Sequence, residues 1–204
     1  MRSLVLLSAG MTLSVVVAPA AAQFSDPDFR TCQDKYGAEA IAGCTAAIGS
    51  GKLSTEYRAI TYLTRGTIFL EQKYYARAMA DFNKSIQTDP KLALAFTTRG
   101  DVYFLQKNYA RAMVDYDKAI RLNPGHATTF GNRGQTYFMQ KRYVRALADL
   151  DEAVRLDPED AADALYARGL VKMKLRDPSG SKDDIARALV LDPGIAKQFE
   201  YLKK

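Results

Sequence analysis

The sequence predicts an all-helical protein made of repeated helix pairs, and three periodic features support this fold class. The dipeptide Arg-Gly recurs after 34, 34 and 35 residues, and prolines recur with the same three spacings. Between these markers, large and small apolar residues follow at intervals of three and four, which places them on one face of an α-helix. Periods of this length are typical of stacked repeats. The pairs begin at Arg65, Arg99, Arg133 and Arg168, and the prolines are Pro90, Pro124, Pro158 and Pro193.

The first element is an expected signal peptide, residues 1–22. Arg2 supplies a positive charge, and residues 4–18 form an uncharged, mostly apolar run. Because this run is shorter than the roughly 20 residues that span a bilayer, we favour cleavage over retention as a membrane anchor. Ala20 and Ala22 are the small residues that a signal peptidase needs, and we expect cleavage after Ala22. The mature protein is then exported, without a membrane span, and its expected location is the periplasm.

The second element, residues 23–58, is expected to be a cap that contains a partial repeat and a disulfide. Cys32 and Cys44 are the only cysteines, and an even count in an exported chain favours a disulfide. Twelve residues of unbroken helix would separate them by about 18 Å, so the chain has to reverse, and Gly37 is the expected bend. A metal site or a catalytic thiol is the alternative, but the chain has a single histidine, His126.

Four repeats follow the cap, and a short helix closes the chain. The repeats occupy residues 59–92, 93–126, 127–160 and 162–195, with one extra residue before the fourth, and residues 196–204 are the expected C-terminal capping helix end. In each repeat, the first helix carries a large apolar residue, a glycine and an aromatic residue on one face. The second helix carries alanine, a large residue and a small residue, and an Asp or Asn before the proline ends it.

This order of residues resembles the tetratricopeptide repeat (TPR), and the resemblance covers residues 59–195. It implies an all-α TPR solenoid, a right-handed superhelix of antiparallel helix pairs, with about four full repeats plus N- and C-terminal capping helices. Neighbouring pairs stack because no pair can bury its apolar face alone. The fourth repeat departs from the pattern with Lys172 in place of an aromatic residue and Ser181 in place of alanine. We expect it to be a looser terminal repeat.

An arginine stands before the glycine in all four repeats, where the family usually has an apolar residue. An aspartate follows each arginine after 16 residues, on the second helix of the same repeat. Recurrence in every repeat favours a structural ion pair, because a half-buried arginine needs a partner. A repeated site for an anionic ligand is the alternative. The expected pairs are Arg65 with Asp81, Arg99 with Asp115, Arg133 with Asp149, and Arg168 with Asp184.

The resemblance implies that a partner binds in a groove lined by the first helices. Four of the groove residues share one position and could form an apolar stripe: Leu70, Phe104, Phe138 and Met173. The Lys, Asn and Arg residues of the family's carboxylate-binding groove are nearly absent, so an extended or helical peptide with apolar anchors is favoured. Alternatively, these side chains only pack against neighbouring helices. The other expected groove residues are Leu63, Thr67, Thr97, Asp101, Gln135 and Tyr166.

Neither catalysis nor nucleic-acid binding is expected. His126 is expected in an exposed turn, and the loop at residues 49–54 lacks the first glycine of a phosphate-binding loop, since Ala46 stands there. The net charge is +6, but acidic and basic residues alternate instead of forming a basic stripe. We expect a non-catalytic bacterial adaptor without metal or cofactor that binds a protein or peptide. Two alternatives stay open: an accessory subunit of envelope polysaccharide or cell-wall assembly that binds glycan or lipid, and a self-associating structural protein.

Overall fold

The computed structural model describes residues 26–200, and every regular element in this range is an α-helix. The expected signal peptide therefore lies outside the described residues. The chain divides into an N-terminal part, residues 26–102, and a C-terminal part, residues 103–200, with the boundary inside one helix. The N-terminal part holds α1 (Pro27–Asp34), α2 (Gly37–Gly49), α3 (Thr55–Glu71), α4 (Tyr75–Thr88) and most of α5 (Ala93–Leu105). The C-terminal part holds α6 (Tyr109–Leu122), α7 (Ala127–Met139), α8 (Tyr143–Leu156), α9 (Ala162–Lys174), α10 (Pro178–Leu191) and α11 (Ile195–Gln198).

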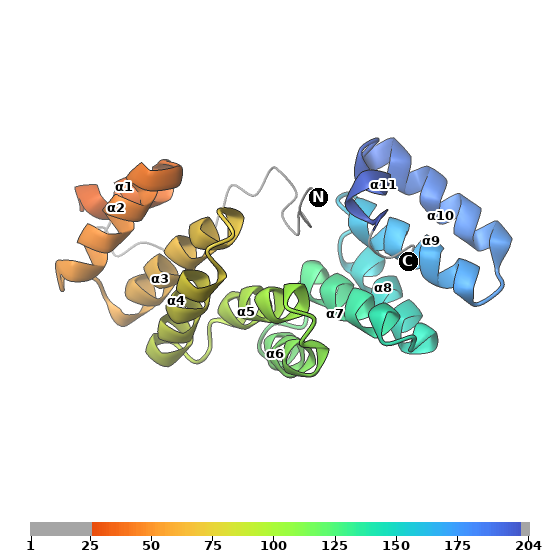
Figure 1. The fold of residues 1–204 in the computed structure, drawn as a ribbon, viewed down its shortest axis with the longest axis horizontal. Helices are drawn as coiled ribbons and strands as arrows, with labels where there is room; N and C mark the ends of the chain where they lie inside the picture. The colour runs from red at the N-terminus through yellow and green to blue at the C-terminus, as the bar shows by residue number, and fades with distance from the viewer. Residues whose placement is uncertain (1–25, 201–204) are drawn as a thin grey trace. The chain divides into compact units, whose positions relative to one another are not determined.

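Within each part, consecutive helices pack in pairs, α3 with α4, α7 with α8 and α9 with α10 (Figure 1). Gly66 and Gly134 each lie where the two helices of their pair are in close contact. A Cβ atom added to Gly66 would lie 2.7 Å from Phe82, and one added to Gly134 would lie 2.8 Å from Leu150. Both of these large side chains are fully buried. The glycine therefore leaves the space that the large residue of the second helix fills.

The two helices of each repeat are joined by a turn that contains a residue with positive φ. Glycine favours this conformation, but other residues occupy the position here. Lys73, Lys107, Lys141 and Arg176 adopt positive φ values of 59–65° in these turns. The backbone N–H of Lys141 donates to Phe138 and that of Arg142 donates to Tyr137, at 2.8 and 2.9 Å, and the other three turns repeat this pattern. The turn thus satisfies the last carbonyl groups of the first helix. A basic side chain there also interacts favourably with the helix dipole.

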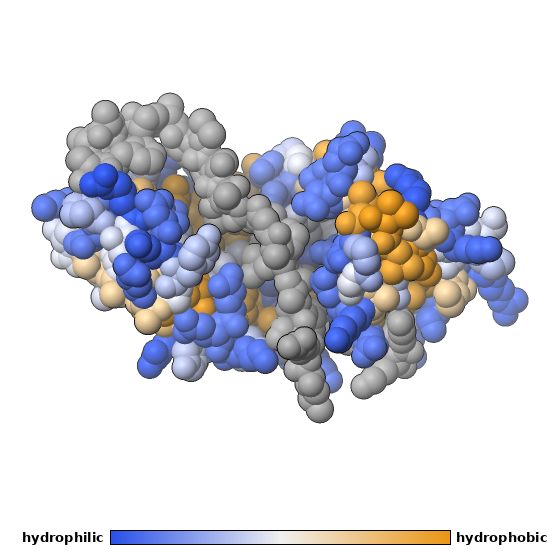
Figure 2. All heavy atoms as spheres, turned by 90° about the horizontal axis from the view of Figure 1, so that it is seen from above, coloured by the Kyte–Doolittle hydropathy of each residue, from blue (hydrophilic) through white to orange (hydrophobic). Residues whose placement is uncertain are grey.

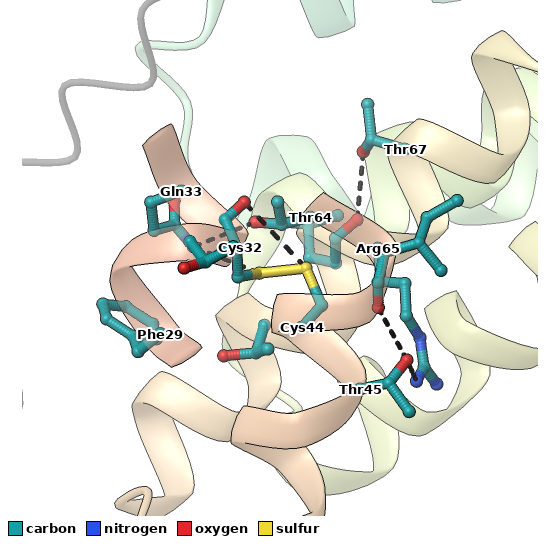
Figure 3. Close-up of a disulfide and its surroundings, with 12 residues drawn as sticks. Phe29, Cys32, Gln33, Cys44, Thr45, Thr64, Arg65 and Thr67 are labelled. Carbon is teal, nitrogen blue, oxygen red and sulfur yellow. Dashed lines mark hydrogen bonds between the residues drawn. A yellow bond between two sulfur atoms is a disulfide. The ribbon is translucent and has the colours of Figure 1, made fainter. Parts of the chain in front are cut away.

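The N-terminal cap is closed by the expected disulfide between Cys32 of α1 and Cys44 of α2 (Figure 3). The chain reverses between the two helices, and Gly37 has a φ of 62°. Gly43 permits the close approach, since a Cβ atom there would lie 2.8 Å from the backbone nitrogen of Cys32. The disulfide therefore joins α1 and α2 covalently, and Gly43 allows their backbones to approach each other.

The C-terminal helix α11 begins at Ile195, one residue before the expected capping element, and residues 201–204 lie outside the described range. Ile195 and Phe199 are buried, and the Phe199 ring lies 5.3 Å from the ring of Tyr166 on α9. Phe199 occupies the place in the repeat that Phe130 and Leu165 occupy on α7 and α9. This helix therefore corresponds to the first turns of a further first helix.

Candidate partner-binding face

The expected groove residues lie on α3, α5, α7 and α9, and we call these ten residues the first-helix face. In the N-terminal part, Leu63 of α3 and Thr97 and Asp101 of α5 are buried. Thr67 and Leu70 of α3 are half-buried, and the Thr67 hydroxyl donates to the backbone oxygen of Leu63. The open side chains on this part of the face are thus those of Thr67 and Leu70.

In the C-terminal part, four of the five expected face residues are buried, namely Phe104, Gln135, Phe138 and Tyr166. The Phe104 ring lies 5.6 Å from the ring of Tyr109, and the Phe138 ring lies 5.5 Å from that of Tyr143. Both contacts join an aromatic residue near the end of a first helix to the first residue of the second helix. The two phenylalanines thus stabilise the turn of their own repeat. Met173 is 55% exposed, so the C-terminal end of the apolar stripe is accessible to solvent.

The arginine at each repeat forms the pair that the sequence predicts wherever both residues lie in one part. Arg133 Nε and Nη2 each lie 2.8 Å from a carboxylate oxygen of Asp149. Arg65 binds Asp81 in the same bidentate way at 2.8 Å, and Arg168 binds Asp184 at 2.6 and 2.7 Å. The hydrogen bonds that Arg133 donates to Asp149 raise the pKa of Arg133 despite its burial. Arg99 and Asp115 belong to different parts, and their pairing stays a prediction.

Each arginine also bonds to the second helix of the preceding repeat, a contact that the sequence analysis missed. Arg133 Nη1 lies 2.7 Å from Asp117, and Arg168 Nη1 lies 2.9 Å from Asp151. Arg99 Nη1 donates to Asn83 at 2.8 Å. In the cap, Thr45 takes this place and accepts from Arg65 at 2.8 Å (Figure 3). The guanidinium group therefore joins adjacent helix pairs. The sequence does contain a pattern that could have predicted this contact: three of the arginines have an acceptor residue 16 or 17 positions before them.

The fourth repeat has an additional ion pair, which explains one of its departures from the pattern. Lys172 Nζ lies 2.8 Å from Asp184, the same carboxylate that Arg168 binds. Burial opposes ionisation of Asp184, but the bonds from Arg168 and Lys172 outweigh it and lower its pKa. Lys172 therefore replaces an aromatic contact with a charged one.

His126 and Asp163 also have shifted pKa values. His126 precedes α7 and is half-buried, whereas the sequence predicted an exposed position. Its ring nitrogen Nδ1 lies 2.6 Å from the Thr129 hydroxyl, and burial lowers the pKa of His126. Burial raises the pKa of Asp163 on α9 to about 6, and the nearby charges of Asp192 and Asp160 add to the shift. A deprotonated Asp163 is therefore costly in the folded protein.

Neither a cluster of metal-ligating side chains nor a membrane-spanning helix occurs among the described residues. Within residues 26–200, His, Cys, Asp and Glu side chains form no group of three or more that could hold a metal ion. Over the same range, no helix combines the length and the apolar character that crossing a bilayer requires.

Comparison with known families identifies the repeats. Models of the tetratricopeptide repeat family match residues 59–92, 93–126 and 127–160, which make up half of the chain. These ranges coincide with the first three repeats predicted from the sequence. No curated protein sequence matches the chain.

Several solved structures are similar to this chain. The first TPR of Spaghetti (RPAP3), bound to an HSP90 peptide, has 23% identity and a TM-score of 0.56, covering 59% of this chain and 94% of that one. MamA from Desulfovibrio magneticus RS-1 has 19% identity and a TM-score of 0.62, covering 76% and 85%. A chain of the APC/C hetero-tetramer Cut9–Hcn1 has 21% identity and a TM-score of 0.68, covering 81% and 33%. At these identities the likeness concerns the fold.

Proposed function

Because the chain belongs to the tetratricopeptide repeat family, we propose that it is a non-catalytic scaffold whose first-helix face binds a protein or peptide partner. One observation carries this proposal. Residues that close each helix pair recur in all repeats, whereas those on the first-helix face differ. At one position of the first helix they are Leu63, Thr97, Gly131 and Tyr166, and four residues later Thr67, Asp101, Gln135 and Leu170. Variation between repeats is expected where a face recognises a partner, and Thr67, which is half-buried, is the residue of this set that a partner could contact.

A peptide with apolar anchors fits this face best. Leu70 is half-buried and Met173 is exposed, and both belong to the expected apolar stripe. The TPR of Spaghetti is bound to an HSP90 peptide, which supports a peptide as the class of ligand for this fold. Apolar side chains of a partner would gain free energy by covering the Leu70 side chain.

Affinity capture tests this function. Tagged full chain carrying Leu70→Asp should lose one specific partner that the unchanged chain retains, because an aspartate would be desolvated in the contact. Val114→Asp is the matched control, since Val114 is 66% exposed on the second helix α6. Both variants should show the unchanged circular dichroism spectrum. Equal partner recovery with both variants would show that this face is not the binding site.

We further propose that the protein is exported to the periplasm after cleavage behind Ala22. The disulfide between Cys32 and Cys44 supports this location, because disulfides persist in oxidising compartments. Intact-mass measurement of the protein from its natural host should give a chain that begins at Gln23 and is two hydrogens lighter than its reduced form. A chain that retains residues 1–22 and free thiols would contradict export.

A further inference from the structure

The C-terminal part carries positive charges at one end of its helices, and we call these residues the basic edge. Three lie where α7 turns into α8, and two lie where α9 turns into α10. They are Lys141, Arg142, Arg145, Lys174 and Arg176, and all five are exposed. The two turns lie side by side, because residues 141–145 and Leu175 line one open pocket of about 490 Å³. Figure 2 shows hydrophilic side chains at the right-hand end of the view, where Figure 1 places the turn between α9 and α10.

Neither ion pairs nor helix stability account for the basic edge. Within the part of the chain that the structure describes, none of its five side chains takes part in an ion pair. Asp177, in the same turn as Arg176, instead caps α10 through the backbone N–H of Gly180. Arg142 is the N-cap of α8 and Arg145 lies in its first turn, an end at which the helix dipole disfavours cations. The basic edge is therefore suited to an anionic group from outside.

Negative charge gathers at the opposite end of the same helices, and we call these residues the acidic edge. They are Asp157, Glu159 and Asp160 between α8 and α9, Asp163 in the first turn of α9, and Asp192 after α10. Besides burial, the charges of Asp192 and Asp160 raise the pKa of Asp163, so the two loops lie close together. Among residues 26–200, no ion pair neutralises these carboxylates. Because α9 has 13 residues, about 20 Å separates the two edges.

We propose that copies of this chain associate head to tail, with the basic edge of one copy bound to the acidic edge of the next. Charge complementarity identifies the occupant, since five cations at one edge match five carboxylates at the other. A membrane or another polyanion would account for the basic edge but would leave the acidic edge without a role. Acidic and basic residues alternate along the sequence, and the fold sorts them to opposite ends of the helices.

The loop of residues 157–160 fits the pocket at the basic edge. All four of its residues are exposed, and they comprise three carboxylates and Pro158. Apolar side chains line the pocket beside the cations, and of these Val144 is 74% exposed. Covering Val144 with Pro158 of the next copy would remove apolar surface from water. The guanidinium carbon of Arg145 lies 5.9 Å from the centre of the Tyr137 ring, which positions it to donate to a carboxylate of the loop.

The position of the two edges sets the symmetry of the association. Because they lie at opposite ends of the helices, the contact is heterologous and each copy keeps one edge open. Copies therefore add one after another instead of closing as a symmetric dimer. No residue of either edge belongs to the first-helix face, so this contact goes beyond the partner binding proposed for that face.

Sedimentation velocity of the purified protein tests the proposal. At about 0.02 M NaCl, species larger than a dimer should form as the protein concentration rises. At about 0.5 M NaCl the protein should be a monomer, because salt screens exposed charges. The dissociation constant of the contact should rise at least about tenfold between the two conditions.

Two variants with neutral substitutions locate the contact. The basic-edge variant carries Lys141→Gln and Arg142→Gln, and the acidic-edge variant carries Glu159→Gln and Asp160→Asn. Each variant alone should be a monomer at a concentration at which the unchanged protein assembles. An equimolar mixture should form a dimer and nothing larger, because one intact edge of each kind remains.

The control variant removes two charges elsewhere. It carries Lys182→Gln and Arg187→Gln, two exposed positions along α10 that lie outside both edges. It should assemble like the unchanged protein, and all three variants should melt like it.

Four outcomes would overturn the proposal. The unchanged protein stays a monomer at low salt; either edge variant alone assembles as the unchanged protein does; the mixture gives no dimer; or the control variant loses assembly to the same extent. A monomer that sediments with phosphatidylglycerol vesicles, and does so less with the basic-edge variant, would assign the basic edge to a membrane and would also overturn it.

Discussion

At the scale of single residues, a glycine sets how closely the two helices of a repeat approach. Gly134 and Gly131 lie on the same helix, α7, but have different surroundings. A Cβ atom at Gly134 would lie 2.8 Å from Leu150 and 3.3 Å from the backbone oxygen of Ala146, whereas one at Gly131 would meet nothing closer than 4.0 Å. The two positions therefore separate the effect of close packing from that of helix propensity.

We expect Gly134→Ala to lower the free energy of unfolding by about 1–3 kcal/mol, because the added methyl group overlaps Leu150 and a backbone oxygen. Gly131→Ala should leave it unchanged or raise it by up to about 1 kcal/mol, since alanine favours the helix more than glycine. Urea unfolding followed by circular dichroism gives both values. Equal effects of the two substitutions would show that Gly134 is not a close packing contact.

Asp163 is a second residue whose environment predicts a measurable effect. In the folded protein the pKa of Asp163 is about 6, above its ordinary value of 3.8. Between these two pH values, Asp163 therefore keeps its proton in the folded state but has lost it in the unfolded chain. Stability at this site therefore falls as pH rises through that window, and the loss is complete above about pH 6. Asp163→Asn should raise the free energy of unfolding by roughly 1–3 kcal/mol at pH 7 and change it little at pH 4.

Urea unfolding at pH 4 and pH 7 measures this difference, and Asp183→Asn on the exposed side of α10 is the control. A gain that is the same at both pH values would contradict a proton held by Asp163.

At the scale of helices, the arginines make two kinds of contact that differ in burial. Within its own repeat, Arg133 binds Asp149, and their side chains are 18% and 10% exposed. Toward the preceding repeat it binds Asp117, whose side chain is 42% exposed. Removing a partner costs more where the remaining charge has less water around it. The contact within the repeat should thus contribute more than the contact between repeats.

We expect Arg133→Leu to lower the free energy of unfolding by about 2–4 kcal/mol, because Asp149 is then buried without its cation. The double variant Arg133→Leu with Asp149→Leu should recover at least half of that loss. Asp117→Ala should cost about 1 kcal/mol or less, as exposed ion pairs do. Denaturant unfolding of the four proteins measures all of these values. A loss with Asp117→Ala as large as that with Arg133→Leu would contradict the ranking.

At the scale of the whole chain, the sequence predicted the repeat pattern better than the function of its surface. The 34-residue period located the helix pairs, and the distance of 16 residues identified the partner of Arg133, because both follow from one regular repeat. Contacts across repeats, such as Arg133 with Asp117, were missed because only distances within a repeat were considered. The alternative that Phe104 and Phe138 only pack within the protein was left open, but their partners were not predicted, since each ring packs across a turn onto a tyrosine whose direction the helix period does not give.

The signal peptide, the periplasmic location and the superhelical sense stay predictions. The expected absence of catalysis is also open to experiment; His126, the one histidine of the chain, is bonded to the Thr129 hydroxyl at the start of α7. Binding through the first-helix face is therefore the claim on which the functional account depends.

Photo-crosslinking tests that claim most directly. A benzophenone side chain at Thr67, which lies half-buried on α3, should form covalent adducts with one protein other than the chain itself in its natural host. The same group at Val114 on α6 should not, and mass spectrometry of the adducts should locate the attached partner peptide. Adducts to the chain itself alone, or the same partners from both positions, would contradict binding through the first-helix face.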